Sequence, residues 1–130
     1  MQTKINTAIE PWLTLKNGEE AVAFYRSAFN AEETYRLSDP GGGLVVRLAV
    51  NGAGFWISGE SVSTEINKPI SPLGGDNVRM ILIVDDPEKL FAQAIKAGAK
   101  EIFPVGEEYG WRLGRVSDPF GMHWEIGHQL

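Results

Sequence analysis

The sequence lacks cysteine altogether, and it holds two histidines in 130 residues. Without thiols the chain cannot form a disulfide, a thiolate metal site or a cysteine nucleophile, and the absence also fits a reducing compartment. Any metal site would therefore depend on carboxylates and on a scarce imidazole.

Positive charge and long apolar runs are also scarce. Twelve Lys and Arg residues stand against seventeen Asp and Glu residues, which gives a net charge of -5. Because nucleic-acid binding needs a basic footprint, we expect no nucleic-acid partner, whereas a cationic ligand is permitted. No segment reaches the roughly 20 apolar residues of a membrane span, and the start does not suit a signal peptide. We expect a cytoplasmic protein without a membrane partner.

What the chain does contain is a repeated order of elements. Apolar periodicity predicts a strand, a helix and three strands, and then the same order again. Asn17 and Glu20 are typical of a capping box at the first helix, and Asp86 with Pro87 starts the second. The halves match at an offset of 69 without a gap, with Leu13 on Leu82. The predicted strands cover residues 8–15, 32–37, 44–50 and 55–58, and then 79–84, 101–105, 111–117 and 122–127.

The segment between the two halves, residues 60–76, is rich in Ser, Thr, Pro and Gly and shows no periodicity, which is typical of a linker. We therefore predict one α+β domain over residues 1–130, with module one at 8–59 and module two at 77–128. Each module has the order βαβββ.

The clearest candidate for a functional position lies near the C-terminus. Asp118-Pro119 with Gly121 is turn chemistry, and an alternating strand follows it. On such a strand His123 and Glu125 share one face, while Trp124 lies on the other. A carboxylate aimed at one side of a sheet is costly unless it is paired, so Glu125 marks a candidate site.

The tandem modules, with the terminal pattern Asp118-Pro119-x-Gly121-x-x-x-Glu125, resemble the vicinal oxygen chelate superfamily, which contains glyoxalase I, bleomycin-resistance proteins and extradiol dioxygenases. Residues 24–29 and 111–121 are most similar to its small bacterial glyoxalase/bleomycin-resistance-like branch. The resemblance implies a curled half-barrel sheet, a homodimer and a small-molecule ligand inside the concavity. In the metalloenzymes of the family, the first and last strands of each module hold a divalent ion.

This sequence departs from that metal pattern. Glu125 matches the terminal carboxylate ligand, but the other three positions hold Glu10, Trp56 and Arg79. An indole cannot bind a metal, and a guanidinium places a permanent positive charge where the ion would lie. We therefore hypothesise that Arg79 replaces the metal and pairs bidentately with Glu125 or Glu10, and we predict no cofactor.

Two alternatives stay open for these residues. Glu10, His123 and Glu125 could chelate a divalent metal together, and Glu10 or Glu125 could then act as a general base in an isomerase, lyase, transferase or dioxygenase. In the other, His123 is a partly buried hydrogen-bonding residue and Glu10 is a surface acid.

The aromatic residues define the expected ligand surface. Strand parity places Trp12 and Trp56 on the concave face and Trp111 and Trp124 on the other. Trp12, Trp56, Arg79, His123 and Glu125 are thus the candidate ligand-binding residues, and a planar, apolar or cationic small molecule would suit them. If side chains fill the cavity instead, only a structural or partner-binding dimer is left.

Overall fold

The computed structural model describes residues 5–38, 40, 43–59 and 78–130, so the expected linker lies outside the described residues. Each half of the chain forms a four-stranded mixed sheet and one helix, which confirms the α+β fold of two tandem βαβββ modules. The elements are β1 (Trp12–Thr14), α1 (Gly18–Phe29), β2 (Glu32–Ser38), β3 (Leu44–Val50), β4 (Ala53–Ser58), β5 (Met80–Ile83), α2 (Pro87–Ala97), β6 (Lys100–Glu108), β7 (Trp111–Ser117) and β8 (His123–Gln129).

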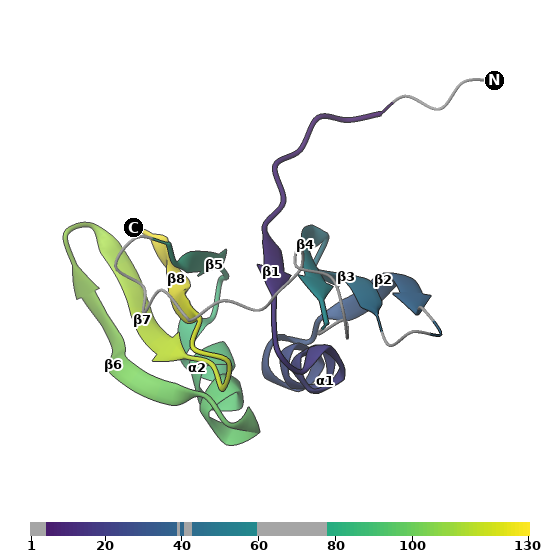
Figure 1. Cartoon of the computed structure of the whole chain (residues 1–130). Helices are drawn as coiled ribbons and strands as arrows, with labels where there is room; N and C mark the ends of the chain where they lie inside the picture. The colour runs from purple at the N-terminus through teal and green to yellow at the C-terminus, as the bar shows by residue number, and fades with distance from the viewer. Residues whose placement is uncertain (1–4, 39, 41–42, 60–77) are drawn as a thin grey trace.

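The two sheets have the same topology. Their strand orders are β1-β4-β3-β2 and β5-β8-β7-β6, and only the first strand of each module pairs in parallel with its neighbour. Figure 1 shows the helices α1 and α2 side by side, with one sheet on either side of the pair. Neither of these two helices, in the part of the chain that the structure describes, is long and apolar enough to cross a membrane.

The two modules share one core, because strand alternation turns one face of each sheet toward the helices. Val46 and Ile57 in the first sheet and Val116 and Ile126 in the second are completely buried. Trp124 joins the halves, since its ring centroid lies 4.8 Å from that of Phe29 on α1. The core position expected for Trp124 is confirmed, because its side chain is 3% exposed.

Asp118 adds a polar link between the modules. Its Oδ2 accepts hydrogen bonds from the Tyr25 hydroxyl at 2.5 Å and from Trp124 Nε1 at 2.9 Å. Its Oδ1 accepts from the backbone N–H groups of Phe120 and Met122, both at 2.9 Å. Burial and the neighbouring Asp118 charge raise the pKa of Tyr25 well above its usual range. One buried carboxylate thus fixes the turn before β8 and ties it to α1.

Two local predictions were wrong. The first strand covers Trp12–Thr14 rather than residues 8–15, because Pro11 has no N–H to donate to a ladder and Ile9 is exposed. The capping box at α1 does not form, since the Asn17 side chain makes no cap hydrogen bond and its amide donates instead to Glu20 at 3.4 Å. The Asp86 cap of α2 is confirmed, because its side chain accepts from the Lys89 N–H.

The gap-free repeat was also wrong in its middle part. The helix N-caps Asn17 and Asp86 are 69 positions apart, but the C-caps Asn30 and Gly98 are 68 apart, since α2 is one residue shorter. The turn between β7 and β8 restores the lost residue. Trp56 and Glu125 are again 69 apart, although their cross-strand partners Arg47 and Arg115 are 68 apart.

The face of each sheet that points away from its helix is here called the open face. In the first sheet it carries Trp12, Arg47 and Trp56, which are register partners or alternate with buried positions. In the second sheet it carries Arg115 and Glu125, which lie opposite each other on β7 and β8. The candidate side chains therefore lie on the open faces.

Candidate functional site

The open face of the first sheet holds a pair between Glu10 and Arg47. Arg47 donates from Nε to Glu10 Oε1 at 2.9 Å and from Nη2 to Oε2 at 2.7 Å, which is a fork-to-fork arrangement. Trp56 Nε1 donates a third hydrogen bond to Oε1 at 2.8 Å. The Arg47 and Trp56 hydrogen bonds lower the pKa of Glu10 to about 2. Glu10 is therefore a stably ionised, fully paired acid rather than a surface acid.

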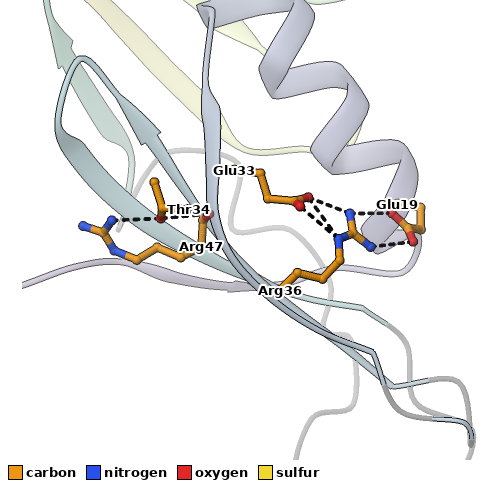
Figure 2. A network of polar contacts seen from close by, with 5 residues as sticks. All are labelled: Glu19, Glu33, Thr34, Arg36 and Arg47. Atoms are coloured by element: carbon orange, nitrogen blue, oxygen red, sulfur yellow. Dashed lines mark hydrogen bonds and ion pairs between the residues drawn. The ribbon is translucent and has the colours of Figure 1, made fainter.

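Side chains of β2 contact Arg47 and, on the face toward the helix, bind α1 (Figure 2). Arg47 Nη1 donates to Thr34 Oγ1 at 3.1 Å, so β2 helps to orient the Arg47 guanidinium. Farther along β2, Arg36 binds Glu19 of α1 with its two terminal nitrogens at 2.9 and 3.1 Å, and it also contacts Glu33. These partly exposed ion pairs attach the edge strand β2 to the helix.

An aromatic stack covers the same open face. The Trp12 and Trp56 rings lie 5.7 Å apart with an interplanar angle of 12°, and the Tyr35 ring is 5.6 Å from Trp56. Trp12 Nε1 donates to Ser58 Oγ at 3.0 Å, which holds the indole in place. Trp12 and Tyr35 are each about half exposed, at 49% and 47%. The expected aromatic wall is present at Trp12 and Trp56.

The open face of the second sheet holds Glu125 between two arginines. Arg115 donates from Nε and Nη2 to Glu125 Oε2 at 3.2 and 2.8 Å. Arg79 Nε lies 3.3 Å from Oε1. The expected ion pair between Arg79 and Glu125 is therefore present, but it is a single contact rather than a bidentate one. Glu10 pairs with Arg47 and not with Arg79.

A pocket of about 460 Å³ opens directly beside this cluster. Arg79 and Glu125 lie in its lining, and apolar side chains from β5, β6 and β7 form much of the remainder: Ile81, Phe103, Pro104, Trp111 and Leu113. Glu107, Glu108 and Tyr109 complete it near the turn between β6 and β7, together with Gly106. The volume lies within the range of small-molecule sites, and the mixture of apolar walls with a few polar groups is typical of them.

The prediction that Trp111 lies on the face opposite the ligand surface was wrong. It shares the open face with Leu113 and Arg115, because these positions alternate along β7, and it lines the pocket. Trp12 and Trp56 belong to the first sheet and are absent from the lining of this pocket. The pocket beside Glu125 also contradicts the alternative in which Trp side chains and the Arg-Glu pair fill the cavity.

The structure does not bring Glu10, His123 and Glu125 together. Among the described residues, no group of three or more His, Cys, Asp or Glu side chains could hold a metal ion. His123 Nδ1 is buried and has no hydrogen-bond partner in that part of the chain. Both oxygens of Glu10 and Oε2 of Glu125 accept hydrogen bonds from Arg or Trp, and Oε1 of Glu125 forms an ion pair with Arg79. This donor set does not suit a divalent ion, which needs three or four neutral or anionic ligands.

Sequence reasoning missed Arg47 and Arg115, and a signal for both was available. Counting outward from the turn Asn51-Gly52 places Arg47 opposite Trp56. Counting outward from the turn at residues 119–121 places Arg115 opposite Glu125. Cross-strand partners on one face lie about 5 Å apart, so Arg115 could have been assigned to Glu125, and Arg47 to the open face beside Trp56.

Comparison with known proteins gives the family. The model of the Glyoxalase/Bleomycin resistance protein/Dioxygenase superfamily matches residues 5–126. An uncharacterized protein of Mycobacterium tuberculosis, Rv0887c, is 33% identical over 134 residues, covering 100% of this chain and 79% of the relative. A solved structure from Arabidopsis thaliana, the product of At5g48480, is 28% identical with a TM-score of 0.72, covering 95% of this chain and 100% of that chain.

Two further solved structures share the fold at lower identity. TnmS3, an antibiotic binding protein from Streptomyces sp. CB03234, has a TM-score of 0.71 and 16% identity, covering 99% of this chain and 100% of that chain. A mutant of the fosfomycin resistance protein FosX from Listeria monocytogenes, in complex with Mn(II) and 1S,2S-dihydroxypropylphosphonic acid, has a TM-score of 0.69 and 19% identity, covering 98% of this chain and 95% of that chain. Because the family model spans almost the whole chain, this protein belongs to the glyoxalase/bleomycin resistance protein/dioxygenase superfamily.

Proposed function

We propose that this protein binds a small molecule in the pocket of its second module and does so without a metal ion. The observation that carries the proposal is the pocket of about 460 Å³, with Arg79 and Glu125 at one side and aromatic and aliphatic walls around the remainder. Such a pocket suits a planar, largely apolar ligand. The fold shared with an antibiotic binding protein supports a binding role.

The charges around Glu125 support the absence of a metal. A divalent ion at this carboxylate would lie a few ångströms from Arg79 and Arg115, both of which already contact it. With an effective dielectric of about 20, each such arginine would repel the ion by roughly several kcal/mol. The two guanidinium groups instead supply the positive charge that an ion would supply, as the hypothesis for Arg79 requires.

A metal-dependent enzyme is the second candidate, and it is favoured by the Mn(II) complex of FosX, which has the same fold. The chemistry of this chain supports it less. A general base works best with a pKa near the working pH, whereas Arg47 and Trp56 hold the pKa of Glu10 at about 2. Glu125 accepts hydrogen bonds from Arg115 and forms an ion pair with Arg79, so its charge is already paired.

The proposal can be tested with the neutral fluorescent probe N-phenyl-1-naphthylamine and a variant that fills the pocket. Gly106 lines the pocket, and a Cβ added there would meet no atom within 4 Å. Gly106→Trp should therefore place an indole in the ligand volume and weaken probe binding at least about tenfold, while Gly106→Ala should bind nearly as the natural chain does. Equal binding by all three proteins would overturn the proposal.

The metal-free part needs a separate measurement. Purified protein should contain well under one equivalent of transition metal per chain, and calorimetric titration with Mn²⁺ and Zn²⁺ should show no tight binding. The same titration of Arg79→Ala, which removes one charge that repels the ion, tests whether Arg79 is what weakens metal binding. One tightly held ion per natural chain would support the enzyme instead.

We also propose that the protein is a homodimer in the cytoplasm. The edge strands β2 and β6 are exposed over almost their whole length, and large apolar side chains such as Ile81 and Leu37 are half exposed on the sheets. A second copy could cover such edges and faces. Light scattering at micromolar concentration should give twice the mass of 14.3 kDa, and a monomer mass would contradict the dimer.

A further inference from the structure

We infer that the ligand of the pocket in module two carries an anionic group, of the carboxylate or sulfonate class, and that Arg79 receives it. The inference rests on the proposed binding function and adds the charge of the ligand to it. Its basis is the state of the charged groups at the pocket, taken one at a time.

The acids near the two aromatic surfaces are already neutralised. Glu10 is bound by both donors of Arg47 and by Trp56. Glu125, which is 6% exposed, is bound by Arg115 through two hydrogen bonds and by Arg79 through one contact. A cationic ligand would find no free carboxylate at either cluster, so the cationic alternative from the sequence loses its main attraction.

The positive charges at Glu125 exceed the negative one. Arg115 donates two hydrogen bonds to the Glu125 carboxylate, and its guanidinium also lies 5.4 Å from the centroid of the Phe103 ring. Arg79 approaches the carboxylate most closely with Nε, at the long distance of 3.3 Å, and its side chain is 41% exposed. Among the described residues, neither of its two Nη atoms donates a hydrogen bond to a side chain. The four N–H bonds of these two atoms can donate hydrogen bonds to the oxygens of a ligand in a planar, bidentate manner.

The remaining acids of the lining, Glu107 and Glu108, are exposed to solvent. Glu107 is 56% exposed and pairs with Arg112 at 3.4 Å, and Glu108 precedes the exposed turn at Tyr109. Charges that are solvated in this way are screened within about 10 Å at ordinary ionic strength. Arg79 is less exposed than Glu107, so its charge is screened less. The walls Ile81, Phe103 and Trp111 then hold an apolar ring, and Arg79 holds the acid at its end.

Two probes with the same rings separate this inference from the binding function. N-phenyl-1-naphthylamine is neutral, and 8-anilinonaphthalene-1-sulfonate carries one sulfonate on the same skeleton. Fluorescence titration of the natural protein should give at least about fivefold tighter binding of the sulfonate. The advantage should shrink as salt rises from about 20 to 500 mM, since the attraction to Arg79 is then screened.

Arg79→Gln should remove the advantage of the sulfonate while leaving the neutral probe within about twofold. Arg26→Gln is the matched control, because it removes the same charge from the exposed side of α1, and it should change neither affinity. Arg79→Lys keeps the charge without the planar fork and should retain part of the advantage; it also replaces Arg79→Gln if that variant does not fold.

The outcomes are distinguishable. If neither probe binds in a manner that Gly106→Trp abolishes, the proposed binding function fails. If the neutral probe binds in the pocket but Arg79→Gln and Arg79→Lys leave the ratio of the two affinities unchanged, the inference about the anion is overturned while the binding function stands.

Discussion

Arg115 on β7 and Glu125 on β8 lie opposite each other, and both donors of the Arg115 fork reach a single oxygen of the carboxylate. The other oxygen is left for Arg79. A related pair occurs in the first sheet, where Arg47 on β3 binds both carboxylate oxygens of Glu10, which precedes β1, instead of a residue on β4. In each module, an arginine on the third strand, β3 or β7, binds the acid, although the acid comes from a different position in each.

Glu125→Gln should lower the free energy of unfolding by about 1–3 kcal/mol, because two partly buried guanidinium groups lose their counter-charge. Urea denaturation followed by circular dichroism measures the change. Glu108→Gln is the control, since it alters an exposed acid on β6 and should stay within about 0.5 kcal/mol. Equal stability of both variants would show that the arginine cluster adds nothing to folding.

Tyr25→Phe should cost about 1.5–3 kcal/mol of stability, because it removes a buried hydrogen bond to the Asp118 carboxylate and leaves the ring packing in place. Tyr109→Phe provides the comparison, since Tyr109 is 92% exposed. Thermal and urea unfolding of both variants would measure the difference. A loss below about 0.5 kcal/mol for Tyr25→Phe would mean that Asp118 is satisfied by its other three donors.

The Glu10 carboxyl should titrate with a pKa of about 2 instead of its ordinary 4.5. Because folding depresses this pKa, the pair with Arg47 contributes its stability above about pH 4.5 and loses it as the pH falls toward 2. Carbon-detected NMR of the glutamate carboxyls measures the titration directly. In Arg47→Gln the pKa should rise toward 4.5, and the acid-induced loss of stability between these pH values should become smaller. An unchanged pKa in that variant would refute the assigned cause.

Gly114→Ala should lower stability by about 1–3 kcal/mol. A Cβ at this position would lie 2.8 Å from the backbone nitrogen of Val105 and 2.9 Å from the Phe91 ring, so α2 or β6 would have to move. Gly106→Ala is the matched substitution in the neighbouring strand, where the Cβ meets open space. It should be neutral or stabilising by about 0.4–1 kcal/mol, since alanine restricts the unfolded chain. If the two substitutions have the same effect, packing at Gly114 is not tight.

Strand bounds and the position of Glu125 could be predicted where apolar alternation, turn residues and the cost of burying a charge point to the same structure. β3 and β7 were predicted with their observed bounds, because each alternates apolar residues between clear turn signals. Glu125 was assigned to a site because a buried acid on a terminal strand demands a partner. Glu125 was one of the two acids predicted to pair with Arg79, and that ion pair is present. The predicted bidentate geometry was wrong, since the angle of a guanidinium depends on local packing that strand parity does not give.

Other features could not be reached from single positions. Trp111 was assigned to the wrong face because its parity was not counted from the turn that sets the register of β7 and β8. The pocket itself arises from the course of β6, whose pairing with β7 shifts register twice, between Glu101 and Phe103 and between Phe103 and Gly106. Irregular pairing of this kind bends a strand, and the sequence carries little trace of it beyond Pro104.

Relative to the first module, α2 is one residue shorter and the turn between β7 and β8 is one residue longer. The lengths of these two distant segments are therefore coupled. A deletion in the helix alone would shift β6, β7 and β8 by one residue relative to the core. A shift of one residue exchanges the two faces of a strand, so Glu125 would face the helices and Trp124 would face water. Insertions and deletions in this half are therefore expected to survive among its descendants only in cancelling pairs, so that length changes at the end of the helix predict length changes before the last strand.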